Sequence, residues 1–218
     1  MTINHHLSDP TLLSYAAGNV SEASSLVIVT HVHMCSECRQ KLYDLELLGG
    51  LSLEDSPLSS INPDALEIVL EHIAEQESIP EKPNYKEINN SDIPAPLQSF
   101  LPHGLSEINW KMVAPGIKSF SFSKSKSKTS TIRLLKISPG TAIPEHSHGG
   151  MELTLVLKGS FSDGKTKFFP GDVADLDEDT QHNPIVDNDE DCICLIATDA
   201  PLKFSNFIPR LAQLFTGV

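Results

Sequence analysis

The chain has 218 residues, 39% of them hydrophobic and 21% charged, which is enough for one large folded domain or two ordinary ones. Sixteen Lys and Arg against 29 Asp and Glu give a net charge of −13, which argues against nucleic acid and anionic membranes as direct partners because both repel a polyanion. Residues 1–80 hold two basic and twelve acidic residues, a net charge of −10, and residues 81–218 carry only −3.

Helical patterns fill the first third of the chain. We expect four helices. The first begins at Ser8 and ends at Gly18, and the second begins at Ser21 and runs toward His33. The third begins at Cys35 or Ser36 and ends at Gly49-Gly50, and the fourth begins at Asn62-Pro63-Asp64. Four short helices in about eighty residues form only a small core, and a domain of that size often needs a metal or another crosslink.

A candidate metal site lies at the junction of the second and third predicted helices. His31, Cys35 and Cys38 form an H-x3-C-x2-C pattern, in which the histidine and the first cysteine share a helix face. Three such ligands require a fourth, and His5 or His6 can supply it if the amino-terminal segment folds back. Two histidines and two ionised cysteines neutralise Zn2+, which suits a structural site. The alternative is a partly buried polar histidine beside two free thiols.

The same segment resembles a known family. The histidine pair and the stretch SEASSLVIVTHVHMCSECRQ are similar to the zinc-binding anti-sigma domain, found in regulators that hold an extracytoplasmic-function sigma factor inactive. The fourth ligand in that family is an amino-terminal histidine, and His6 occupies the matching place. The resemblance therefore implies a zinc site made of His6, His31, Cys35 and Cys38.

A proline-rich stretch, residues 79–98, separates this region from a strand-rich one and predicts an extended linker. The expected strands are Thr131–Ile137, Glu152–Leu157, Val173–Leu176 and Ile193–Ala197. Many short strands between turn residues indicate an antiparallel sandwich or barrel. We therefore predict an α+β protein with a four-helix domain at 1–78, a linker at 79–98 and an antiparallel β-barrel at 99–218.

A second metal pattern begins in this barrel at Gly140. His146 and His148 point to one face of a strand, Glu152 follows after a bend, and His182 is the fourth candidate ligand. The spacing G-x5-H-x-H-x3-E-x6-G resembles the first motif of the cupin superfamily, although His182 lies further along than the second motif usually has it. Three imidazoles and one carboxylate suit Zn2+, Mn2+, Fe2+ or Ni2+. The alternative is a metal-free cupin with these side chains as polar filler.

The two remaining cysteines, Cys192 and Cys194, share one face of a predicted strand. They can point inward near the metal or outward, as small apolar residues of a barrel strand or as redox-sensitive thiols. The chain opens with no basic segment followed by an apolar one, and no apolar run approaches the roughly 18 residues of a membrane helix. We expect a cytoplasmic protein without a membrane partner.

Both patterns in this order resemble the ChrR-type anti-sigma factors, which join a zinc anti-sigma domain to a cupin domain. This resemblance implies a regulator and not an enzyme: a 1:1 complex would hold the sigma factor inactive until an oxidant such as singlet oxygen, sensed with the cupin domain, releases it. The acidic first third agrees, because sigma factors use basic surfaces on DNA.

The alternative function is a metal-dependent cupin dioxygenase or isomerase with an accessory zinc domain, in which the cupin ligands hold a catalytic metal. A zinc-finger DNA-binding protein is excluded, because Arg39 and Lys41 are the only basic residues in the first eighty.

Overall fold

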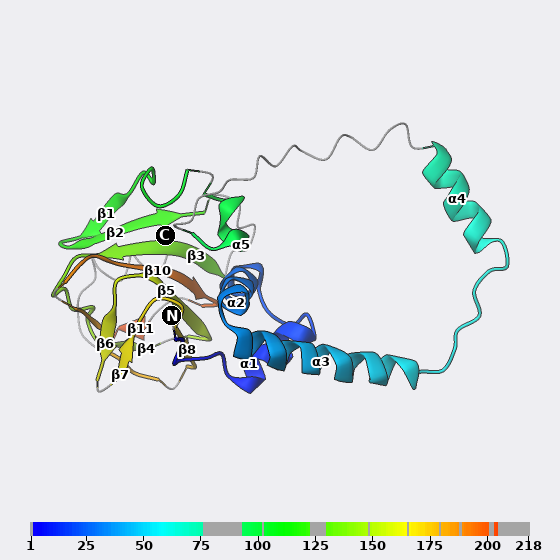
Figure 1. Cartoon of the computed structure of the whole chain (residues 1–218), viewed down its shortest axis with the longest axis horizontal. Coiled ribbons are helices and arrows are strands. Elements are labelled where there is room, and N and C mark those ends of the chain that lie inside the picture. Colours follow the sequence, from blue (N-terminus) through cyan, green and yellow to red (C-terminus); the bar gives the residue numbers. More distant parts are fainter. Residues whose placement is uncertain are drawn as a thin grey trace.

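In the computed structural model, helices precede antiparallel sheets along the chain (Figure 1). The structure describes residues 2–75, 93–101, 103–122, 130–147, 149–164, 166–178, 180–187 and 189–200, and the backbone of 203–204. Within these ranges, none of the helices combines the length and the apolar character needed to cross a membrane.

The first three helices begin at the predicted residues. α1 (Asp9–Ala16) follows Ser8 and α2 (Glu22–Met34) follows Ser21, and each serine side chain accepts a hydrogen bond from an amide of the first turn, at 3.3 and 3.1 Å. α3 (Ser36–Glu54) follows Cys35, whose sulfur accepts a hydrogen bond from the Cys38 amide at 3.4 Å. Each cap satisfies an amide that has no partner inside its helix.

The predicted end of the third helix is wrong, because α3 continues through Gly49-Gly50 to Glu54. Neither glycine has the positive φ angle that is typical of a glycine at a helix end. A glycine inside a helix costs about 1 kcal/mol relative to alanine, which weakens a helix without stopping it. The extra turn carries Leu51 and Leu53 into solvent.

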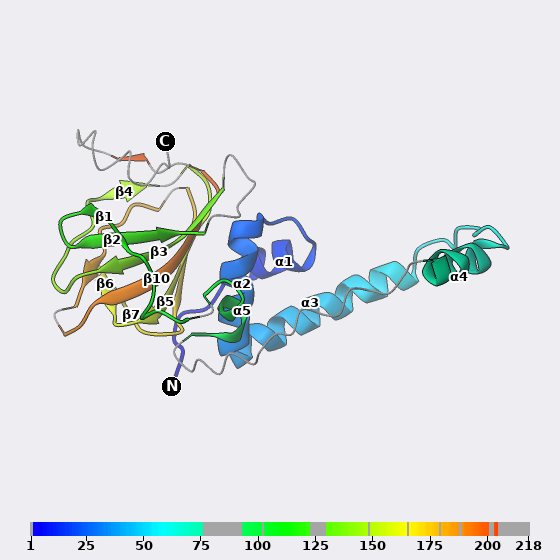
Figure 2. The ribbon, with the colours of Figure 1, turned by 90° about the horizontal axis from the view of Figure 1, so that it is seen from above.

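α4 (Ala65–Glu75) follows Asn62-Pro63-Asp64 as predicted, but it does not join the core of the other helices. None of its residues is buried, and both views show it far from the sheets and from α1 and α2 (Figure 2). All four predicted helices are present, but only α1, α2 and α3 contribute buried residues to the core.

The end of the predicted linker is folded. α5 (Ala95–Gln98) is a short helix, and Ile93 and Leu97 are buried in the same core as α2. The extended conformation expected there is therefore wrong for residues 95–98, and residues 76–92 lie outside the described ranges. The domain boundaries at 78 and 98 stay a prediction.

The described strands form three antiparallel sheets. The largest has the order β1-β2-β3-β10-β5-β8, a second has the order β7-β6-β9, and β11 pairs with β4. In chain order the strands are β1 (Lys111–Ala114), β2 (Ile117–Ser121), β3 (Thr131–Ile137), β4 (His146–Ser147), β5 (Glu152–Lys158), β6 (Phe161–Asp163), β7 (Thr166–Phe168), β8 (Val173–Leu176), β9 (Ile185–Val186), β10 (Cys192–Thr198) and β11 (Lys203–Phe204). The four strands predicted from the sequence are β3, β5, β8 and β10. The strand pairing among the described residues does not close into a barrel.

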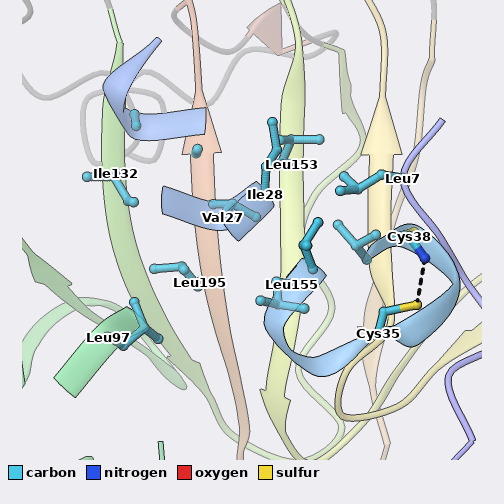
Figure 3. Packing of buried hydrophobic residues seen from close by; sticks show 14 of the residues in the cluster. Leu7, Val27, Ile28, Cys35, Cys38, Leu97, Ile132, Leu153, Leu155 and Leu195 are labelled. Atoms are coloured by element: carbon cyan, nitrogen blue, oxygen red, sulfur yellow. Dashed lines mark hydrogen bonds between the residues drawn. The ribbon is translucent and has the colours of Figure 1, made fainter. Parts of the chain in front are cut away.

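The central strands β3, β5 and β10 are buried on both faces, so they read as continuous apolar runs. One face, with Leu135, Val156 and Cys194, packs in a cluster with phenylalanines of β6 and β7. The opposite face packs against the helices, and Figure 3 shows Val27 and Ile28 of α2 over Leu153, Leu155 and Leu195. The helices and the large sheet therefore share one hydrophobic core.

Candidate metal centres

The first candidate centre lies where the amino-terminal segment meets the junction of α2 and α3. One donor atom from each of His6, His31, Cys35 and Cys38 lies within 4.8 Å of the others. The Nε2 atom of His31 is 3.3 Å from Cys38 Sγ. The Nδ1 atom of His6 is 3.3 Å from Cys35 Sγ and 3.7 Å from Cys38 Sγ. We call this cluster the helical centre.

Local structure explains why the sequence pattern produces this cluster. His31 lies in the last turn of α2, Cys35 caps α3, and Cys38 follows in the first turn of α3. The break between the helices thus turns both sulfurs back toward His31. All three side chains are buried, and His6 is half-buried at the edge of the cluster.

Each histidine of the helical centre is oriented by an acceptor at its other ring nitrogen. The Nδ1 atom of His31 lies 2.9 Å from the carbonyl oxygen of Gly171. A carbonyl only accepts, so Nδ1 donates and the lone pair of Nε2 faces the sulfurs. The Nε2 atom of His6 lies 3.3 Å from the Glu37 carboxylate, which leaves Nδ1 toward the sulfurs.

The interior of the helical centre favours neutral side chains. Burial lowers the pKa of His31 to about 4, against the opposing effect of the Gly171 hydrogen bond. Burial also raises the pKa of the Cys38 thiol to about 11. A neutral imidazole is the form that binds metal, whereas the thiol must lose its proton to do so.

The donor separations fit a tetrahedral ion. Zinc bonds of about 2.3 Å to sulfur and 2.0–2.1 Å to nitrogen place tetrahedral donors roughly 3.3 to 3.8 Å apart. Three of the six donor separations in the helical centre are 3.3, 3.3 and 3.7 Å, and all six are within 4.8 Å. These residues can therefore hold a metal ion with little rearrangement.

The other histidines of this half point elsewhere. The ring of His5 packs on Phe168 with a centroid distance of 4.3 Å, and its Nδ1 atom lies 3.6 Å from the Asp172 carboxylate. His33 and His72 are exposed. Of the two histidines that the spacing left open, the structure brings His6 to the cysteines and turns His5 toward the sheets.

The second candidate centre lies between the sheets, and we call it the sheet centre. Donor atoms of His146, Glu152 and His182 lie within 4.8 Å of one another, and all three side chains are buried. The two histidines face each other across an isolated β-bridge, and Glu152 begins β5. The predicted ligand His148 lies outside the described residues.

Acceptors orient these histidines as well. The Nδ1 atom of His146 is 2.8 Å from the Pro144 carbonyl oxygen, and that of His182 is 3.0 Å from the Asp163 carboxylate. If both Nδ1 atoms carry protons, the lone pairs of the two Nε2 atoms face each other, and these two nitrogen atoms are 2.9 Å apart. A cation between them removes this repulsion, so the sheet centre can also hold a metal. Imidazole and carboxylate ligands suit several divalent transition metals.

Cys194 lines the pocket that contains the sheet centre, together with apolar side chains such as Leu135 and Phe161. The sulfurs of Cys192 and Cys194 are 3.5 Å apart and buried, so both cysteines take the inward orientation of the two considered. The hydrogen bond with Cys192, followed by burial, raises the pKa of Cys194 well above its ordinary value. The thiol form is therefore favoured at Cys194, and a redox role for the pair stays a prediction.

Several supporting residues were missed by the sequence analysis. Glu37 stands between the two cysteines, and Asp163 belongs to a predicted turn, yet neither pattern marks a partner for a histidine. Gly171 is 140 residues from His31, and its contact is made by a carbonyl group that every residue type has. No sequence signal identifies such a contact.

The chain resembles known proteins over both halves. The ChrR cupin-like domain matches residues 103–201. Over 215 residues the chain is 38% identical to the anti-sigma-E factor ChrR of Cereibacter sphaeroides, and the match covers 99% of each protein. It also resembles a chain in the crystal structure of Rhodobacter sphaeroides SigE in complex with the anti-sigma ChrR. That match has a TM-score of 0.76 and 35% identity over 91% of this chain and 100% of that chain.

Proposed function

Because the chain belongs to the ChrR family of anti-sigma factors, we propose that it binds one extracytoplasmic-function sigma factor and keeps it from core RNA polymerase. The solved complex of SigE with ChrR supports this type of partner. The similarity extends over the whole chain and is to a regulator, which favours this function over a cupin dioxygenase or isomerase. The place of action that accords with this role is the cytoplasm.

The observation that carries the proposal is a set of exposed apolar side chains on α3 and α4, for which the described residues offer no partner; the two helices lie apart (Figure 1). We define the apolar helix surface by six side chains that are each between 51 and 71% exposed: Leu47, Leu51, Leu66, Val69, Leu70 and Ile73. The four on α4 recur at spacings of three and four residues, which is the pattern of a helix that docks into an apolar groove. Such a surface marks a site of protein association.

Acidic side chains lie on the same two helices as these apolar residues. Glu46 and Glu54 line the same depression of α3 as Leu47 and Leu51, and α4 contributes Glu67, Glu71 and Glu75. A basic partner would gain both apolar contact and favourable electrostatic steering. This combination agrees with a sigma factor, whose DNA-binding surfaces are basic.

For the helical centre we propose Zn2+ bound by His6, His31, Cys35 and Cys38. Two thiolates and two imidazoles neutralise the ion, and the donor separations suit its tetrahedral geometry. When bound, the ion supplies a crosslink between the amino-terminal segment and the start of α3. It would thereby hold α3 in the orientation that presents the apolar helix surface.

For the sheet centre we propose a divalent metal, Zn2+ or alternatively Mn2+, Fe2+ or Ni2+, held by His146, Glu152 and His182 with His148 as the fourth ligand. We propose that this half senses an oxidant such as singlet oxygen and thereby releases the sigma factor. Cys192 and Cys194 lie close enough to the pocket to take part in that step.

The experiment that tests the proposed function is co-expression of the full chain with each extracytoplasmic-function sigma factor of its source genome, followed by size-exclusion chromatography. We expect a 1:1 complex with one of them. The double substitution Val69→Glu and Leu70→Glu should abolish the complex, because it places two charges in the apolar contact. The matched control, Glu67→Gln with Glu71→Gln, changes the same helix outside the apolar stripe. It should retain the complex and only slow its formation, because these carboxylates steer a basic partner without entering the apolar contact.

Two results would contradict the proposal. One is the absence of a 1:1 complex with every sigma factor tested. The other is a complex that persists in the Val69→Glu and Leu70→Glu variant, which would show that α4 is not the docking helix.

A further inference from the structure

The turn between β7 and β8, residues Phe169–Asp172, contacts both sides of the helical centre, although it belongs to the sheets. Its Gly171 carbonyl accepts the His31 hydrogen bond described above, and this contact is fully buried. Its Asp172 side chain is completely buried and reaches the segment that carries His6. Figure 3 shows Leu7, Cys35 and Cys38 packed beside the sheet strands at this place.

Asp172 joins three backbone amides with one carboxylate. Its Oδ1 atom accepts hydrogen bonds from the amides of Asn4 at 2.7 Å and His5 at 3.0 Å. Its Oδ2 atom accepts from the amide of Phe169 at 2.9 Å, which closes its own turn. A buried carboxylate needs such donors, so the amino-terminal segment and the turn hold each other in place.

The packing at this turn brings the amino-terminal segment into close contact with Gly171. Gly171 has a φ angle of +92°, and a Cβ atom there would lie 2.8 Å from Ile3 Cγ1. The amide of Val173 also donates to the carbonyl of His5 at 3.3 Å. Residues 3–5 therefore lie directly against the turn and the start of β8, one residue before His6.

We propose that the β7–β8 turn positions the metal ligands of the helical centre, so that the sheet half sets the metal affinity of the helical half. Asp172 places His6 through the amides of Asn4 and His5, and the Gly171 carbonyl orients His31. This inference rests on metal binding at the helical centre, as proposed above, and adds that the ligand geometry depends on a turn about 140 residues away along the chain.

The same turn is hydrogen-bonded to the strand that carries Glu152. The Gly171 amide donates to the Val156 carbonyl at 2.9 Å, and the Val156 amide donates to the Asp172 carbonyl at 3.0 Å. Val156 and Glu152 lie on the same strand, β5. The turn is therefore fixed to a central strand of the large sheet, which keeps the Gly171 carbonyl and the Asp172 carboxylate in place.

The test uses Co2+ titration of the metal-free full chain, because the thiolate-to-Co2+ absorption band reports the sulfur ligands of the helical centre. We expect Asp172→Asn to weaken binding at this band by about 10- to 100-fold, the usual effect of losing a group that orients a ligand. The matched control is Asp175→Asn, which weakens an exposed 2.9 Å hydrogen bond that the Ser8 amide, beyond His6, donates to the carboxylate; this variant should bind as the unmodified chain does.

A second variant covers the case in which Asp172→Asn does not fold. Asn4→Pro removes one amide donor to Asp172 in an exposed terminal segment and leaves the carboxylate and the sheets unchanged. It should weaken Co2+ binding in the same direction, by about tenfold.

The outcomes separate the two proposals. If the unmodified chain shows no thiolate band, metal binding at the helical centre itself is wrong. The unmodified chain could instead bind Co2+ with the same affinity as the Asn4→Pro variant and any Asp172→Asn variant that folds. In that case metal binding at the helical centre stands, and the positioning role of the turn is overturned.

Discussion

In both metal centres a hydrogen-bond acceptor orients each histidine, but the acceptors lie at different distances along the chain from the histidines they orient. In the sheet centre, the acceptors Pro144 and Asp163 belong to the same half as His146 and His182. In the helical centre, the acceptor of His31 comes from a turn of the sheet half. Both acceptors of the sheet centre therefore belong to the sheets, as its histidines do, whereas the helical centre joins the two halves of the molecule.

The largest effect should come from removing the sulfurs that distinguish the helical centre. Cys35→Ala with Cys38→Ala deletes two of four ligands, so we expect metal affinity there to fall by more than a thousandfold, given structural zinc energies of about 10 kcal/mol or more. Metal analysis of the purified chain should show one ion fewer per chain. The matched pair His146→Ala with His182→Ala should remove the other ion and keep the first. Unchanged metal content in either pair would contradict the assignment of that centre.

The second prediction concerns pH and also separates the centres. Cysteine thiols are ordinarily protonated at neutral pH, and burial raises the pKa of Cys38 to about 11, so metal binding at the helical centre must expel thiol protons. Binding that releases two protons weakens about a hundredfold for each pH unit as the pH falls. The sheet centre contains no sulfur ligand and should show a shallower dependence between pH 8 and 7. Zn2+ competition titrations across this range measure how steeply the affinity of each centre depends on pH. Equal slopes for the two centres would contradict this prediction.

A third prediction tests whether the sheet centre is self-contained. Asp163→Ala removes the carboxylate that lies 3.0 Å from His182 Nδ1, so metal affinity at the sheet centre should fall by about 10- to 100-fold. The thiolate-to-Co2+ band of the helical centre should keep its midpoint in the same variant. A shift of that midpoint comparable to the loss at the sheet centre would show that the two centres are not separable in this way.

The smallest effect is expected at Glu37. Its carboxylate orients His6 at 3.3 Å but is 56% exposed, so water can replace much of the interaction. Glu37→Gln should weaken Co2+ binding at the helical centre by less than tenfold, and Gln40→Ala on the same exposed helix serves as the control. A loss as large as that expected for Asp172→Asn would place the main support of the site on α3 and not in the sheet half.

Features that depend on neighbouring residues could be predicted from the sequence. Ser8 and Ser21 cap their helices because the bonds run to amides three residues away. The apolar runs of β3 and β5 identified strands because both faces of these strands are buried. The spacing of His31, Cys35 and Cys38 identified the helical cluster, and the family resemblance selected His6 over His5.

Features that depend on distant residues could not be predicted. The end of α3 was misplaced because glycine lowers helix stability only modestly, and local sequence does not reveal whether the helix continues past it. Ile93 and Leu97 looked like linker residues because the core that buries them is formed by α2 and the large sheet. α4 has the apolar spacing of a core helix, yet all its residues remain accessible because the described part of the chain offers it no partner surface.

The sequence by itself determined the ligand types, their local spacing and the two-part organisation, because these depend on side-chain chemistry and on backbone bonds between near neighbours. Only the tertiary structure decided how His6 is brought to the cysteines, how each imidazole is turned, and that one carboxylate of the sheets holds the amino-terminal segment. The physical reason is that a hydrogen bond between groups 140 residues apart forms only after hydrophobic burial has brought the two halves together.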